Sequence, residues 1–79
     1  MSKLKEAVRL LGTGDWEAAH PLVQEDGSRL GCWAHGIVHL LEGDLGNAGY
    51  WYRRAGRTPP DPSRAGNEIE ELRAAIDTA

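Results

Sequence analysis

The chain of 79 residues contains no phenylalanine, a single cysteine and no long apolar run. One cysteine, Cys32, excludes an internal disulfide, so the simplest expected compartment is a reducing cytoplasm. No apolar stretch approaches the ~18 residues that cross a bilayer, so we expect no contact with a membrane. Residues 1–5 include two lysines and lack the apolar core of a signal peptide.

An excess of basic residues is also missing. Nine lysines and arginines stand against twelve acids, which gives a net charge of −3. A nucleic-acid binder normally carries a strongly basic stripe, so this balance argues against that class. At this length we expect one small domain with modest stability, because only about 60% of the unfolded surface can be buried.

The chain does contain the spaced small and aromatic residues of a helical-hairpin repeat. That pattern requires a glycine, a small residue, an aromatic, a second small residue and a closing proline, with a turn between its two helices. The turn is Gly43-Asp44, and the five spaced residues are Gly36, Ala48, Tyr52, Ala55 and Pro60. At two positions where such a hairpin shows apolar or aromatic residues, this chain has His35 and His39.

Apolar periodicity and capping residues predict five helices, at about 3–11, 16–25, 29–42, 45–55 and 64–78. Asp15, Ser28 and Ser63 are the expected N-caps, and Asn47 is expected to cap the fourth helix. Pro21 either kinks the second helix or marks a later start for it.

Leucine pairs, Gly-Asp turns and alanines recur about 30 residues apart along the chain. The predicted fold is therefore all-α and forms a single domain over residues 1–79. It consists of two antiparallel, tetratricopeptide-like helical hairpins, at about 3–25 and 29–56. A proline connector at 58–62 leads to a C-terminal capping helix at 64–78.

The segment from Trp33 to Gly56 resembles a family of small, uncharacterised, mostly bacterial helical proteins. These proteins share a sequence motif that consists, in order, of Trp-x-His, a second His, Glu-Gly-Asp and Asn-Ala-x-Tyr-Trp-Tyr-Arg-Arg-Ala-Gly. The resemblance covers residues 15–57. It implies a helical fold and no particular activity.

A possible metal site lies on the third predicted helix. Cys32, His35 and His39 fall within about a 60° arc of one helix face, and Glu42 extends the row by a turn. Thiolate, imidazole and carboxylate are the ligands of zinc and copper sites. His20, on the neighbouring predicted helix, is a candidate for a further ligand.

The same histidines also fit a polar core, which we favour over a metal site at this stage. His35 and His39 occupy inward positions of the repeat, where Glu42, Glu17 or a backbone carbonyl would satisfy their nitrogens. A nucleophilic Cys32–histidine pair is the least favoured hypothesis, because side chains stacked on one helix face seldom present an attack trajectory. We assign no catalytic residue.

An aromatic and basic segment follows on the fourth predicted helix. Tyr50, Trp51 and Tyr52 fan over about 200°, so they cannot all face one core. Arg53 and Arg54 come next and could stack on the aromatic rings or bind a carboxylate or phosphate on a partner. Arg57 and Arg64 extend this basic cluster. For the cluster as a whole we favour ion pairing with the acidic last helix, whose acids are Glu68, Glu70, Glu71 and Asp77.

The function expected from this organisation is that of a small cytoplasmic interaction module that needs no cofactor. Stacked hairpins need about three units to bury a continuous core, so we expect the chain to bind a protein or to form a homodimer that buries Trp16, Trp33 or Trp51. The candidate partner-binding residues are Trp33, Asn47, Tyr50, Trp51, Arg53 and Arg54. The alternative is a zinc or copper site built from His20, Cys32, His35, His39 and Glu42.

Overall fold

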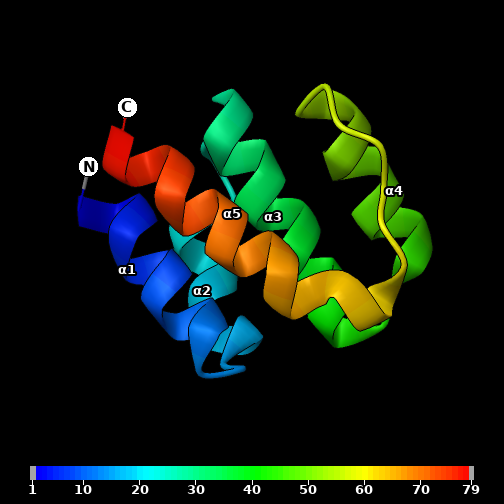
Figure 1. Ribbon diagram of the computed structural model, residues 1–79, viewed down its shortest axis with the longest axis horizontal. Coiled ribbons are helices and arrows are strands. Elements are labelled where there is room, and N and C mark those ends of the chain that lie inside the picture. The colour runs from blue at the N-terminus through cyan, green and yellow to red at the C-terminus, as the bar shows by residue number, and fades with distance from the viewer. Residues whose placement is uncertain (1, 79) are drawn as a thin grey trace.

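The computed structural model describes residues 2–78, which form five α-helices and one short 3-10 turn (Figure 1). No strand occurs in this range, so the all-α prediction is confirmed. The elements are α1 (Ser2–Gly12), α2 (Trp16–Val23), α3 (Arg29–Glu42), α4 (Leu45–Arg54), η1 (Pro62–Arg64) and α5 (Ala65–Thr78).

Side-chain caps fix the starts of three helices. The Asp15 carboxylate accepts a hydrogen bond from the Ala18 backbone N–H at 3.1 Å, and the Ser28 hydroxyl accepts one from Gly31 at 3.0 Å. The predicted cap of α4 was wrong. Asp44 caps that helix by accepting from the backbone N–H of Asn47 at 3.3 Å, because a cap lies before the first turn and Asn47 lies inside it.

Pro21 lies inside α2, which begins at Trp16 under its Asp15 cap. Proline removes one helical donor and crowds the preceding turn. The helix ends at Val23, two residues short of the predicted end. The sequence did not decide whether Pro21 lies inside this helix or marks a later start. In the structure Pro21 lies inside α2, near the C-terminal end of the helix.

The two halves of the chain pack as helical hairpins, α1 with α2 and α3 with α4. Gly36 allows the close approach of α3 and α4. A Cβ atom at this position would lie 2.5 Å from Cδ1 of Tyr52, whose side chain is fully buried. The glycine and the aromatic residue of the repeat pattern therefore contact each other directly.

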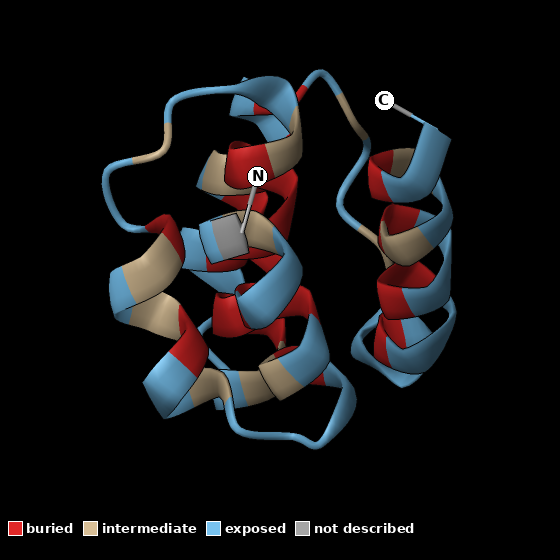
Figure 2. Cartoon of the chain, turned by 90° about the vertical axis from the view of Figure 1, so that its left-hand side faces the viewer, coloured by how far each residue is buried: buried red, intermediate tan, exposed pale blue. Residues whose placement is uncertain are grey.

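Helix α5 closes the fold by packing across α1 and α3. In Figure 2 its buried positions lie on the side that faces the rest of the chain, and these include Ile69, Leu72 and Ile76. The predicted start of this helix needs a correction. α5 begins at Ala65 and follows the 3-10 turn η1, in which Ser63 lies. Asp61 caps that turn, with its carboxylate accepting from the Ser63 N–H at 2.9 Å, and Pro62 opens it because its fixed φ suits a first helical position.

One acid of α5, Glu68, is buried and bonds to a tryptophan and a tyrosine instead of an arginine. Glu68 is 7% exposed and accepts hydrogen bonds from the Trp33 indole at 3.0 Å and the Tyr52 hydroxyl at 2.9 Å. Burial and the Glu68 carboxylate raise the pKa of Tyr52 far above its usual value. Glu68 therefore joins α5 to both helices of the second hairpin.

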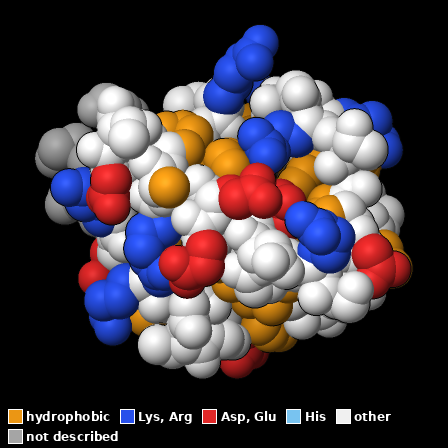
Figure 3. Space-filling model, viewed as in Figure 1, with side chains coloured by type: hydrophobic (Ala, Val, Ile, Leu, Met, Phe, Trp, Pro, Cys, Tyr) orange, Lys and Arg blue, Asp and Glu red, His pale blue; other side chains and the backbone are white. Residues whose placement is uncertain are grey.

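Elsewhere, acidic and basic side chains are interspersed on the face seen in Figure 3, in keeping with the nearly balanced charge. None of the helices within residues 2–78 is both long and apolar enough to span a membrane.

Candidate functional site

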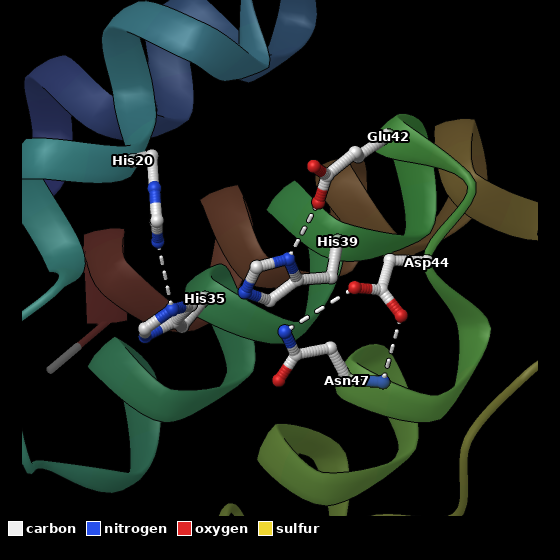
Figure 4. A network of polar contacts seen from close by, with 6 residues as sticks. All are labelled: His20, His35, His39, Glu42, Asp44 and Asn47. Carbon is white, nitrogen blue, oxygen red and sulfur yellow. Dashed lines mark hydrogen bonds and ion pairs between the residues drawn. The ribbon is translucent and has the colours of Figure 1, made fainter.

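All three histidines of the chain converge at one point (Figure 4). His35 and His39 lie one turn apart on α3, and His20 reaches them from α2. α2 packs against α3, and Ala19, which precedes His20, is fully buried. We call His20, His35 and His39 the histidine cluster.

The imidazole rings of the histidine cluster are in mutual contact. The Nε2 atoms of His20 and His35 lie 3.1 Å apart, and the three pairs of ring centroids are separated by 4.9, 5.2 and 5.0 Å. Each residue offers one ring nitrogen within 4.8 Å of the others. The cluster therefore brings three nitrogen donors from two hairpins to one place.

Glu42 orients one ring of the cluster from outside. Its Oε1 lies 2.8 Å from Nδ1 of His39. A carboxylate only accepts hydrogen bonds, so this contact places a proton on Nδ1, and the neutral form of the His39 ring then has its lone pair on Nε2. A carboxylate on the outer nitrogen is the usual support of a metal-binding histidine, and it also suits a histidine in a polar core.

His35 lies deepest in the cluster, with 3% of its surface exposed. Its ring stacks on Trp51 of α4, with centroids 3.9 Å apart and planes at 12°. Burial, followed by the nearby His39 and His20, lowers the pKa of His35 to about 4. His35 is therefore neutral at pH 7, and neutral imidazole is the form that binds metals.

A polar core formed by these rings alone is incompletely satisfied. The Nδ1 atom of His35 is buried and has no hydrogen-bond partner among the described residues. Leaving such a group unpaired costs about 1–3 kcal/mol. An ion on Nε2 of His35 would leave Nδ1 equally unpaired, so this atom does not distinguish the polar core from the metal site.

One nitrogen pair of the cluster has nearly the spacing of two ligands on a tetrahedral ion. Ligand nitrogens 2.0–2.1 Å from zinc stand about 3.3 Å from each other. The His20 and His35 Nε2 atoms, 3.1 Å apart, need little adjustment to reach this geometry. Imidazole nitrogen is a ligand for zinc and copper alike.

Two residues of the predicted metal site do not join the cluster as ligands. Cys32 is buried on α3, but its Sγ lies 4.0 Å from the backbone oxygen of Asp26, in the connection between α2 and α3. Glu42 contacts the outer nitrogen of His39. A second group of possible metal ligands consists of Glu42, His39 and the exposed Asp44.

Sequence reasoning did not connect Trp51 with His35. The sequence indicated His35 as a metal-site candidate on the third predicted helix and Trp51 as a partner-binding candidate on the fourth. The close approach of α3 and α4 at Gly36 was the available signal, because it brings the inner side of α4 against the histidines of α3.

The predicted partner-binding residues are divided between the core and the surface. Trp33 is 4% exposed, and the guanidinium of Arg57 lies 3.6 Å from its ring centroid. Tyr50 is 49% exposed, and the Arg54 guanidinium lies 5.0 Å from the ring centroid of Trp51. Asn47 is exposed and donates from its side chain to Asp44 at 3.3 Å.

Arg53 and Arg54 form no ion pair with an acid of α5 in residues 2–78, so the favoured pairing for these two arginines was wrong. Both lie on α4, which makes no extensive contact with α5. Arg57, beyond the end of α4, does form such a pair with Glu71, at 3.4 Å.

Comparison of the chain with protein-family models, with curated proteins and with solved structures found no match. The family resemblance of residues 15–57 therefore stays a prediction, and the function is argued from the histidine cluster itself.

Proposed function

We propose that the protein binds one first-row transition-metal ion, zinc or copper, through His20, His35 and His39. The observation that carries this proposal is the convergence of three ring nitrogens within 4.8 Å of one another. Three imidazoles are the protein ligands of a well-known class of zinc sites.

The protonation states support metal binding. His35 is neutral because its pKa lies at about 4. In its neutral form, His39 presents a lone pair on Nε2 because Glu42 accepts the proton of Nδ1. His35 can therefore bind an ion at neutral pH without losing a proton, and the bond to Glu42 orients the ring of His39.

Metal titration of protein purified without a histidine tag tests the proposal. We expect one zinc ion per chain, by competition with a chromophoric chelator and by elemental analysis. The double variant His35→Ala/His39→Ala should lose this binding, whereas Cys32→Ala on the same helix should keep it. Wild-type protein that binds no zinc or copper in excess of the double variant contradicts the proposal.

We propose self-association through α4 as a second candidate function. Leu45 and Tyr50, with 52% and 49% of their surfaces exposed, are the two exposed large hydrophobic side chains of the described range, and both lie on α4. A homodimer in a reducing cytoplasm would cover them, as expected from the small number of hairpin units.

Light scattering after size exclusion tests this second candidate. We expect a dimer at high protein concentration, weakened by the double variant Leu45→Ser/Tyr50→Ser. A monomer at every concentration would exclude homodimerisation and leave the metal proposal unaffected.

A further inference from the structure

We infer that the metal ion keeps one coordination position open for an exchangeable ligand, namely water or hydroxide, or a small anion that replaces it. This inference rests on the proposed metal site and extends it from ion binding to a centre that can take up a ligand. It follows from the donor count, the position of Glu42, the exposure of the cluster and the charge of its ligands.

The donor count leaves the coordination incomplete. Within residues 2–78, three histidines and no cysteine or carboxylate meet at the cluster. Zinc sites that only stabilise a fold are closed by four protein ligands, whereas three protein ligands leave the fourth position to water or substrate. The Sγ of Cys32, the nearest ligand by sequence, faces the Asp26 carbonyl instead.

Glu42 does not supply the missing ligand. Its carboxylate lies 2.8 Å from Nδ1 of His39, the nitrogen on the other side of the ring from Nε2. In Figure 4, Glu42 stands beyond His39, away from His20 and His35. The carboxylate therefore holds the orientation of one ligand from outside the coordination sphere.

The cluster is less buried at His20 than at His35 and His39. His35 and His39 are buried, at 3% and 6% exposure, and the Trp51 ring covers one face of His35. His20, on α2, is only partly buried. A coordination position beside His20 would therefore be the one nearest to solvent.

The charges favour an anionic ligand. Three neutral imidazoles do not offset the +2 charge of a divalent ion. The nearest carboxylate, that of Glu42, is bonded to Nδ1 of His39 and not to the ion. Ions of this kind lower the pKa of bound water to about 7, and they attract small anions to the same position. The expected ligands are therefore hydroxide and monodentate anions such as azide.

Cobalt(II) in place of zinc makes the open position visible, because its d–d absorption depends on coordination. We expect one Co²⁺ per chain with the absorption of a four-coordinate ion, and a saturable change in that spectrum when sodium azide is added. The double variant Arg53→Ala/Arg54→Ala should give the same azide response, because the spectrum reports only ligands on the ion and not anions bound to arginine.

Two outcomes overturn the inference and are distinguishable. If Co²⁺ binds stoichiometrically but excess azide leaves the spectrum unchanged, the site is closed and the metal proposal stands. If neither Co²⁺ nor zinc binds to the wild type, the metal proposal fails and the open position fails with it.

Discussion

The Nε2 atoms of His20 and His35 lie 3.1 Å apart, although the two residues are separated by 15 positions and belong to different hairpins. Any ion held by both rings would join α2 directly to α3. A bound metal would then restrain the relative placement of the two hairpins, in addition to any chemistry at the ion.

We expect zinc to stabilise the protein against unfolding and His20→Ala to remove this effect. An ion at 100 times its dissociation constant adds about 2.7 kcal/mol to the free energy of unfolding, provided that the unfolded chain binds it weakly. Thermal denaturation with zinc and with a chelator measures the difference. Glu17→Ala, an exposed substitution on the same helix, is the control and should keep the zinc response. An equal zinc response in His20→Ala would show that His20 is not a ligand.

Gly36→Ala should destabilise the protein by about 1–3 kcal/mol, the usual cost of overpacking a core. The added Cβ would lie 2.5 Å from the buried ring of Tyr52, so α3 and α4 would have to separate. Gly46→Ala is the matched control on α4, because a Cβ there meets open space and alanine favours helix. Urea denaturation should give opposite signs for the two variants, and equal signs would contradict the close approach at Gly36.

Glu68→Ala should cost about 3 kcal/mol, because it leaves the buried donors of Trp33 and Tyr52 without their acceptor. Glu68→Gln should cost less, since both donors bond to one oxygen, Oε1, which an amide also provides. Glu70→Ala removes only an exposed ion pair with Arg73 and should change stability by less than about 1 kcal/mol. The order of the three variants in chemical denaturation checks this prediction.

The metal-free protein should gain stability as the pH rises from 4 to 6.5 because of His35. Its pKa falls from 6.5 in the unfolded chain to about 4 in the folded one, so the unfolded state binds more protons in this interval. The contribution is greatest above pH 6.5 and is lost as the pH falls to 4, an effect of about 3 kcal/mol.

Chelator-treated wild type and His35→Gln, measured by urea denaturation across this pH range, isolate the His35 contribution. His20 and His39 contact the His35 ring, and Glu42 contacts His39, so the comparison is between the two pH slopes rather than between single values. Parallel slopes would mean that His35 keeps an ordinary pKa in the folded state.

The secondary structure was largely predictable because its determinants are local. Asp15 and Ser28 begin helices where their side chains can bond to the next turn, and the glycine at 43 ends α3 with a φ of 92°, a conformation that glycine adopts without strain. The caps that were wrong, Asn47 and Ser63, were each displaced by an aspartate two or three residues earlier.

The site was only partly predictable because it depends on contacts between helices. Helical periodicity placed Cys32 on the same face as His35 and His39, but the face alone does not fix which neighbour each side chain meets. Cys32, in the first turn of α3, lies against the connection at Asp26, whereas His20 meets the middle of the helix. Glu68 was misplaced for the same reason, since its partner Trp33 is 35 positions away.

The stacking of Trp51 on His35 gives the histidine cluster an intrinsic optical probe. An indole 3.9 Å from a ligand ring lies within reach of a paramagnetic ion, so copper(II) at the cluster should quench its fluorescence. Trp33 is fixed by its hydrogen bond to Glu68 and provides a second emitter outside the cluster. In a variant whose other two tryptophans, Trp16 and Trp33, are replaced, the fluorescence of Trp51 would report metal occupancy of the cluster in dilute solution without any attached dye.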